Sequence, residues 1–442
     1  MSTAVGIALS ALAPLHRQTG PVVDQAISDA PSFGILGAYP PTRSGSARFG
    51  AALASALTAY GADVGVVRVS DGTPSASTRV VAELLADSPL SVAACADVLN
   101  QSDVAVIQHQ HGVYGVVDED AVLDIVERLR VPSIVIAHTI RKSPTRQQRC
   151  AFEAIVARAD RLVVMSEVAG ERLRCGFDID RRKVAVIPHG ASVPTTASIR
   201  GGRPTLLTWG LLRPGMGIER VIDAMGSLSG LPGRPRYLIA GPTHPSVLAT
   251  AGEAYRDALI AQALRCGVAD SVFFDAGYRN GPMLTALVQA AAVVVLPYDS
   301  ADEVTSGALV DAVASGRPVV ATAFPHAVEL LGSGAGIVVA HDGPDALVAA
   351  LRRVLTEPRF AGAMAAEARR LAPGWPGRWS PARIWRWPVE WLRSDGYGHD
   401  HNAPAPIFDR LLWLRNSLTR QCLSLSAMTT AGVWPAILEV QP

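Results

Sequence analysis

The sequence predicts an α/β protein built from two doubly wound, Rossmann-like domains with parallel sheets that face each other across a cleft. Three observations lead to this prediction. The chain has 442 residues, which is too many for one ordinary hydrophobic core. Short runs rich in Val and Ile alternate with helix-period segments, a pattern typical of strands buried on both faces by crossover helices. A stretch rich in Gly, Pro, Ser and Thr divides this alternation into two parts.

The first domain is expected over residues 31–194. Apolar runs predict its strands at 33–38, 63–69, 104–108, 133–137, 161–165 and 183–187, and helix-period segments such as 47–60 and 121–129 separate them. Six strands of this kind predict one doubly wound sheet.

The second domain is expected over residues 205–371, after a linker at 195–204. Its predicted strands are 205–208, 236–240, 271–275, 293–296, 318–321 and 336–339. Ligands of open parallel sheets bind at the carboxyl ends of the strands, so two such domains are expected to form a binding site between them.

The two ends of the chain lack these periods. Residues 1–30 are expected to be a disordered leader, because their apolar run is too short for a membrane span and no basic residue precedes it. Residues 372–442 are expected to be an irregular Trp- and Pro-rich tail without a packed domain. A shifted reading frame or a truncated longer product would explain that tail.

The composition narrows the class of protein. The 40 basic and 39 acidic residues nearly cancel, and a net charge of +1 argues against a dedicated nucleic-acid binder. The five cysteines include no CxxC pair, which favours reduced, buried thiols and a cytoplasmic location.

The first predicted strand leads through a glycine-containing turn directly into a helix. Backbone N–H groups and the positive end of the helix dipole would meet an anion near Gly45. An ordinary turn between strand and helix is the alternative interpretation.

Histidines follow the third and fourth predicted strands. One interpretation is a metal site made of His109, His111 and His138, but no acidic or cysteine partner recurs at ligand spacing, so no metal site is predicted. His138 alone is a better candidate for catalysis or sugar binding, because it lies at the carboxyl end of a strand.

A loop in the second domain places Glu303 eight residues before Asp311, with Gly307 between them. Carboxylates accept hydrogen bonds from the neighbouring hydroxyls of a ribose or a hexose, and a glycine lets a ligand approach a helix start. The alternative is an exposed loop with an acid placed on a helix dipole.

Residues 33–371 resemble the family 4 retaining glycosyltransferases of the GT-B fold, and most closely the bacterial members that act on polysaccharides, glycolipids or related glycoconjugates. Five features carry the resemblance in order: the loop 40–45, His138, the segment 186–190, the segment 210–219, and the Glu303/Asp311 pair with the segment 314–322.

The resemblance implies a metal-independent enzyme without a cofactor. Its substrates would be a nucleotide-sugar donor of the GDP-mannose or UDP-glucose type and a glycan, lipid-linked or other glycoconjugate acceptor. It assigns catalysis to His138 and Glu303. The implied donor-binding residues are Gly45, Arg213, Gly217, Glu303, Ser306, Gly307, Ala308 and Asp311, and the implied acceptor-side residues are His109, His111 and Arg141.

Two departures from the family pattern keep other functions open. Met216 stands where the family has a lysine, so Arg213 would have to supply the phosphate counter-charge, and the tail lacks the expected helix that crosses back to the first domain. A catalytically weakened nucleotide-sugar-binding protein and an epimerase or phosphorylase of the same fold are therefore alternatives. The basic residues Arg141, Lys142, Arg146 and Arg149 form either a solvated face or a surface for an anionic membrane or acidic acceptor.

Overall fold

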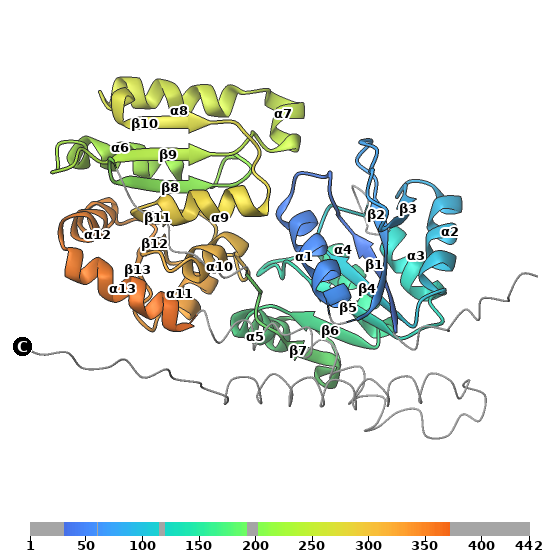
Figure 1. Ribbon diagram of the computed structural model, residues 1–442. Coiled ribbons are helices and arrows are strands. Elements are labelled where there is room, and N and C mark those ends of the chain that lie inside the picture. Colours follow the sequence, from blue (N-terminus) through green and yellow to red (C-terminus); the bar gives the residue numbers. More distant parts are fainter. Residues whose placement is uncertain (1–30, 60, 115–119, 192–201, 372–442) are drawn as a thin grey trace, which may run out of the picture.

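The computed structural model describes residues 31–59, 61–114, 120–191 and 202–371. These residues form two domains, each a parallel sheet with helices on both faces, that stand side by side (Figure 1). The predicted fold class is confirmed. The leader, most of the linker and the tail lie outside the described residues.

The sheet of the first domain has seven strands in the order β3-β2-β1-β4-β5-β6-β7. The strands are β1 (Ser32–Gly37), β2 (Asp63–Val69), β3 (Val80–Leu84), β4 (Val104–His109), β5 (Ser133–Ala137), β6 (Arg161–Val164) and β7 (Val184–Val186). The sequence predicted six of them and missed β3. This edge strand is only half-buried and alternates in exposure, so it has no continuous apolar run.

Several helices of this domain begin at residues whose side chains cap the helix N-terminus. Thr145 and Gln148 form a capping box at the start of α4, and Ser88 and Ser166 accept N–H bonds at the starts of α2 and α5. The helices are α1 (Gly45–Ala59), α2 (Pro89–Leu99), α3 (Asp120–Arg128), α4 (Arg146–Arg158) and α5 (Glu167–Gly176), with a short 3₁₀ helix η1 (Arg181–Lys183).

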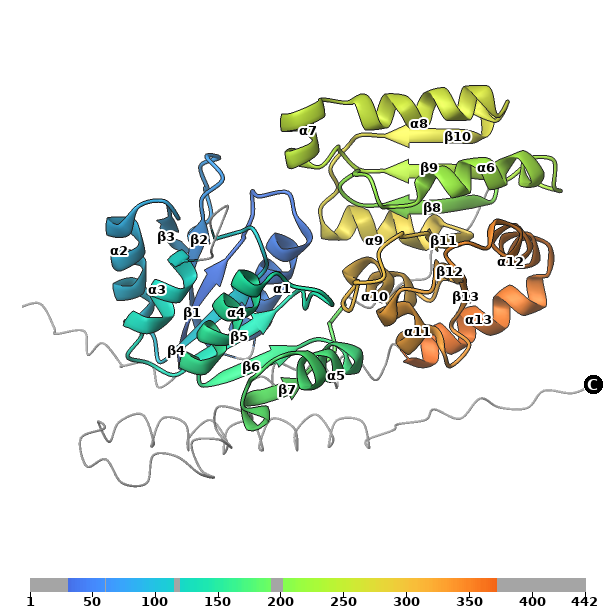
Figure 2. The same ribbon diagram turned by 180° about the vertical axis from the view of Figure 1, so that it is seen from behind.

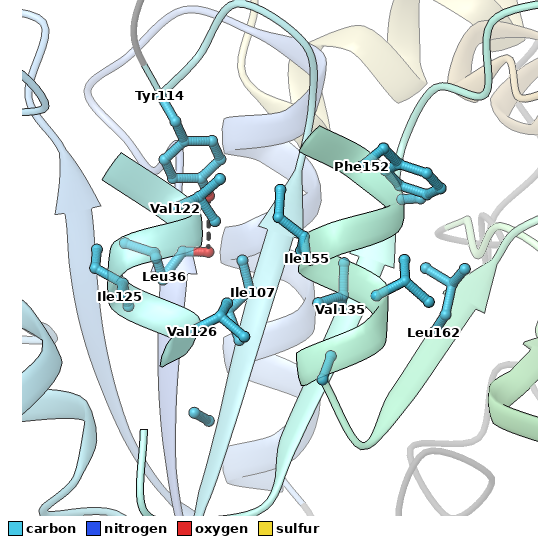
Figure 3. Close-up of a cluster of buried hydrophobic side chains, with 14 of the residues drawn as sticks. Leu36, Ile107, Tyr114, Val122, Ile125, Val126, Val135, Phe152, Ile155 and Leu162 are labelled. Atoms are coloured by element: carbon cyan, nitrogen blue, oxygen red, sulfur yellow. Dashed lines mark hydrogen bonds between the residues drawn. The ribbon is translucent and has the colours of Figure 1, made fainter. Parts of the chain in front are cut away.

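One core layer of the first domain lies between the sheet and helices such as α3 and α4, and a second lies between the sheet and α1. Ile107 and Val135 from adjacent strands lie against Val126 and Ile155 (Figure 3). Tyr114 is fully buried in this layer, and its hydroxyl donates a hydrogen bond of 2.7 Å to the carbonyl oxygen of Gln108. Burial of such side chains stabilises the layer by roughly 1.5–3 kcal/mol for each large apolar residue.

The sheet of the second domain has six parallel strands in the order β10-β9-β8-β11-β12-β13. They are β8 (Thr205–Trp209), β9 (Arg236–Ala240), β10 (Val272–Asp275), β11 (Val293–Leu296), β12 (Val319–Thr322) and β13 (Gly336–Val339). All six correspond to predicted strands. Strands β8, β11 and β12 are buried along their whole length, which explains why their sequence pattern was clear.

Eight α-helices cover this second sheet in the described part of the chain. They are α6 (Ile218–Leu228), α7 (Pro245–Ala251), α8 (Ala254–Arg265), α9 (Gly281–Ala290), α10 (Gly307–Ala314), α11 (Pro325–Leu331), α12 (Pro344–Thr356) and α13 (Pro358–Leu371), with a 3₁₀ helix η2 (Ala269–Ser271).

The two domains contact each other where α5 packs beside α11, and these helices lie next to each other in both views (Figure 2). The Glu329 carboxylate accepts hydrogen bonds of 3.0 and 2.9 Å from the backbone N–H groups of Glu167 and Val168. The Ser166 hydroxyl donates a bond of 2.6 Å to the carbonyl oxygen of Val304. An acid at a helix N-terminus is favourable, so this contact stabilises the arrangement of the domains.

The cysteines were expected to be buried. Cys95 is buried, but Cys150, Cys175 and Cys266 are exposed, so the expectation was wrong for these three.

None of the helices in the described ranges has the length and apolar character needed to cross a bilayer.

Candidate active site

A cavity of about 850 Å³ lies between the domains at the carboxyl ends of both sheets. Its walls come from the loops after β1, β4, β5 and β7 in the first domain and from those after β8, β9, β10 and β11 in the second. Helices α1 and α10 face each other from opposite domains (Figure 1). The cavity therefore lies where doubly wound sheets bind ligands.

The first wall of the cavity is the N-terminus of α1. The Ser44 hydroxyl accepts a hydrogen bond of 3.0 Å from the N–H of Ala47 and caps the helix. Gly45 is exposed, and a Cβ atom added there would meet no other atom within 4 Å. The Arg43 guanidinium lies over the ring of Tyr278 from the other domain, 5.6 Å from its centroid.

The second wall is the N-terminus of α10. Ser306 caps the helix by accepting a 3.2 Å hydrogen bond from the N–H of Leu309, and its own N–H donates to Nδ1 of His326 at 2.8 Å. Gly307 and Ala308 follow and line the cavity. A Cβ atom at Gly307 would come within 3.3 Å of His189 Nε2, so glycine allows the two domains to approach here.

Two histidines lie between these walls, and both are neutral over the ordinary pH range. Burial, together with His189 and His109 nearby, lowers the pKa of His138 to about 3. Burial also lowers the pKa of His189 to about 4, although its Nδ1–H donates to the carbonyl oxygen of Gly190 at 2.8 Å. The ring of Phe49 packs against both histidines, with centroid distances of 4.8 and 5.4 Å.

The carboxylates expected from the sequence both line the cavity. Burial raises the pKa of Glu303 to about 7, with Arg213 opposing and Asp302 adding to the rise. Burial also raises the pKa of Asp311, and Arg48 opposes it through an ion pair in which Nη2 lies 2.7 Å from Oδ2. Each acid thus has a cation from α1 or the 210–217 loop as its counterpart.

The 210–217 loop has a charged and an apolar part. Arg213 is exposed and lines the cavity. Met216 also lines it, but the side chain is only 5% exposed and packs in the core of the second domain. No positive charge comes from position 216, so Arg213 is the cation that this loop offers to the cavity.

Four residues expected in the site do not line the cavity: Gly217, His109, His111 and Arg141. Gly217 is buried with φ of 67°, and a Cβ atom there would lie 1.8 Å from the carbonyl oxygen of Pro297. This glycine is required for packing of its loop. Its assignment as a donor contact gains no support from its place outside the cavity lining.

The histidines after β4 also have other roles. His109 is fully buried, with its ring 5.1 Å from Phe152 and 5.2 Å from the half-buried His111. His109 is the last residue of β4, and its side chain lies in the core. The expected contact between His109 and an acceptor is therefore not supported. Arg141 is exposed and does not line the cavity. Among the described residues, no group of three or more His, Cys, Asp and Glu side chains is placed to hold a metal ion.

Several cavity residues were not singled out from the sequence, among them Arg48, Phe49 and Thr305. Arg48 follows Gly45 by three positions on α1, so helix periodicity could have placed both on one face. Thr305 Oγ1 is buried and has no hydrogen-bond partner among the residues that the structure describes. No sequence signal distinguished that hydroxyl.

Fold and site together define a GT-B architecture, in which two Rossmann-like domains enclose one cleft. A family described as "Glycosyltransferase Family 4" matches residues 43–193, and one described as "Glycosyl transferases group 1" matches residues 195–371. The chain belongs to the family 4 glycosyltransferases. The resemblance inferred from the sequence is therefore confirmed.

Similar proteins support this placement. A D-inositol 3-phosphate glycosyltransferase of Actinosynnema mirum is 29% identical over 269 residues, which are 55% of this chain and 63% of that protein. The chain thus spans less than two thirds of this relative's length.

Solved structures share the fold. Sucrose-phosphate synthase from Thermosynechococcus elongatus superposes with a TM-score of 0.68 at 17% identity, covering 82% of this chain and all of that one. Anabaena HepE in complex with UDP and glucose superposes with a TM-score of 0.63 at 16% identity, covering 83% and 100%.

Proposed function

We propose that this chain transfers a hexose, with retention of anomeric configuration, from a nucleotide-diphosphate sugar to a hydroxyl group of a glycan, lipid or other glycoconjugate. The observation that carries the proposal is the cavity itself. Helix N-termini from opposite domains, two carboxylates and Arg213 surround one space. Helix N-termini and cations suit a diphosphate, and carboxylates suit sugar hydroxyls.

The reaction exchanges one bond for another at the anomeric carbon. The bond from that carbon to the diphosphate oxygen breaks, and a bond to the acceptor oxygen forms on the same face of the sugar. The diphosphate leaves with the electron pair of the broken bond, and its departing oxygen takes up the proton that the acceptor hydroxyl loses. Arg43 and Arg213, with the α1 N-terminus, would stabilise the charge that grows on the diphosphate.

The histidine, the two carboxylates and the start of α10 would contact the sugar and the nucleotide. His138 is neutral, so it would contact the transferred sugar by hydrogen bonding and not by charge. Glu303 would bind sugar hydroxyls, and Asp311 would bind the ribose. The Gly307 and Ala308 N–H groups at the start of α10 would face the donor.

Relatives support the donor class. HepE has been solved with UDP-glucose and with UDP and glucose, and the Actinosynnema relative is named as a glycosyltransferase. A UDP-glucose type of donor is therefore the first to test, followed by GDP-mannose.

A lipid-linked acceptor would bring the protein to a membrane surface. Arg141, Lys142 and Arg146 are exposed in the segment that follows His138 and Thr139, two residues that line the cavity. Arg149 is not available in the same way, because it donates to the carbonyl oxygen of Gly176 and lies over Phe177. Peripheral contact through the first three residues is part of the proposal, and sedimentation with phosphatidylglycerol vesicles tests it.

A donor screen tests the function. UDP-, GDP- and ADP-sugars are incubated with the protein, with and without EDTA, and hydrolysis or transfer is measured. We expect turnover with one donor class that survives EDTA. Complete loss of activity that added metal restores would contradict metal independence. Tight donor binding without turnover would instead identify the weakened binding protein.

A further inference from the structure

We propose that Gln108 is a positioning residue that holds His138 as its Nε2–H tautomer and fixes the ring at the edge of the cavity. Its consequence for catalysis rests on the proposed function. The tautomer itself can be measured without any substrate.

The contact between the two side chains is direct. Gln108 is the residue before the last of β4, only 2% exposed, and it does not line the cavity. Its Oε1 atom lies 3.3 Å from Nε2 of His138. An amide oxygen only accepts hydrogen bonds, so the ring nitrogen that faces it carries the proton. His138 is neutral, so Nδ1 then holds the lone pair and can accept a bond from a sugar hydroxyl.

Two glycines provide the space for Gln108. A Cβ atom at Gly37 on β1 would lie 2.7 Å from Gln108 Nε2, and one at Gly50 on α1 would lie 2.5 Å from it. Neither glycine has a positive φ, so backbone conformation does not require them. Glycine inside a helix lowers stability relative to alanine. The space for the glutamine side chain is thus maintained at a cost in stability.

The glutamine is itself unfavourable for folding. Its Nε2 atom is buried and has no hydrogen-bond partner among the residues that the structure describes. A buried donor left without a partner destabilises a protein, and an apolar residue of similar size would avoid this. A glutamine at this position therefore favours a role in the site over a role in packing.

Other contacts fix the rest of the ring. Phe49 meets His138 edge-on, with centroids 4.8 Å apart and planes at 85°. The His138 backbone N–H donates to the carbonyl oxygen of His109 at 2.9 Å. These contacts set the position of the ring, but neither of them selects a tautomer. Of these contacts, the one from Gln108 Oε1 is the contact that favours one tautomer.

Nuclear magnetic resonance of the full chain labelled with ¹⁵N-histidine tests the tautomer. Long-range ¹H–¹⁵N spectra are recorded for the native protein and for Gln108→Leu and Gln108→Met, with His138→Ala to assign the signals. We expect a protonated Nε2 in the native protein and a mixed or reversed tautomer in both variants. A protonated Nδ1 in the native protein, or an unchanged tautomer in a folded variant, would overturn the proposal.

Kinetics test the positioning role. We expect Gln108→Leu and Gln108→Met to lower kcat about tenfold or more, with donor KM changed less than about threefold and thermal stability not reduced. Gln262→Leu on α8 is the matched control, and we expect native kcat for it. A changed tautomer with unchanged kcat would overturn the positioning role. If the native protein has the predicted tautomer but transfers no sugar, the proposed function fails and the Gln108 contact stands.

Discussion

Arg48 on helix α1 and Asp311 on helix α10 form an ion pair across the cavity, with Nη2 2.7 Å from Oδ2. The two residues are 263 positions apart in sequence and belong to opposite domains. Both side chains remain partly accessible, with exposures of 31% and 24%. The carboxylate proposed to bind the ribose is thus already held by the first domain.

Asp311→Ala is expected to raise the donor KM about tenfold or more, because charge-assisted hydrogen bonds to hydroxyls contribute roughly 1.5–3 kcal/mol. Arg48→Ala should have a smaller effect, since it removes only the partner of the acid. Steady-state kinetics of both single variants and the double variant would measure the coupling. Arg353→Ala, from an exposed pair on α12, serves as a control. Additive effects would show that the pair does not act together in donor binding.

Glu303 is expected to give the reaction a pH dependence with an apparent pKa near 7. In the unfolded chain this carboxyl loses its proton near pH 4.5, whereas burial keeps it protonated in the folded chain until about pH 7. Its contribution to folding stability is therefore present below pH 4.5 and decreases as pH rises to 7.

Glu303→Gln should remove both effects. Thermal unfolding at several pH values should show that the variant gains stability relative to the native protein between pH 5 and about pH 7.5. Donor binding should lose its transition near pH 7. A native profile that persists in the variant would assign the titration to another group.

His138→Ala and Glu303→Ala are each expected to lower turnover about a hundredfold or more, since contacts to the reacting groups are typically worth ~3 kcal/mol of barrier. Circular dichroism should show that both variants remain folded. His341→Ala, which is outside the cavity, should turn over normally. Native-like turnover of both site variants would refute the assignment.

Arg213→Ala is expected to raise the barrier by about 2–4 kcal/mol, because this cation would stabilise the leaving diphosphate. Met216→Lys should not raise turnover above that of the native protein. Its side chain lies in the core, where an ammonium group would be desolvated. The readouts are turnover with one donor and the melting temperature.

A rise of tenfold or more in turnover for Met216→Lys would show that the lysine reaches the diphosphate after all. Met216→Leu tests packing without charge, and it should be close to native in both rate and stability. If neither Arg213→Ala nor Met216→Lys changes turnover or donor affinity, this loop does not contact the donor.

Much of the site could be predicted because its signals are local. Ser306 and Gly307 end a loop and begin a helix, and a capping residue before a glycine is visible in the sequence. Glu303 and Asp311 follow a strongly apolar strand, so their edge of the sheet was predictable. Strand β3 was missed because an edge strand with one exposed face gives a weak pattern.

The places of the expected site residues that do not line the cavity depend on contacts between distant segments. Gly217 has the appearance of a ligand-binding glycine, yet the carbonyl oxygen of Pro297 occupies the space beside it. His109 is the last residue of one apolar strand, and His138 follows another. His109 pairs with Ala137 in the register of β4 and β5, so His138 is one position further along and faces the other way. The His109 side chain therefore lies in the core, whereas His138 reaches the cavity.

The sequence by itself determined two parallel sheets, their helices and the edge of each sheet where polar residues gather, because hydrophobic period and capping are local properties. Only the tertiary structure decided that Arg48 meets Asp311, that Gln108 lies under His138, and that Met216 joins the core. Such contacts depend on how the two sheets and their helices pack together, and packing is decided by shapes and distances that no sequence period encodes.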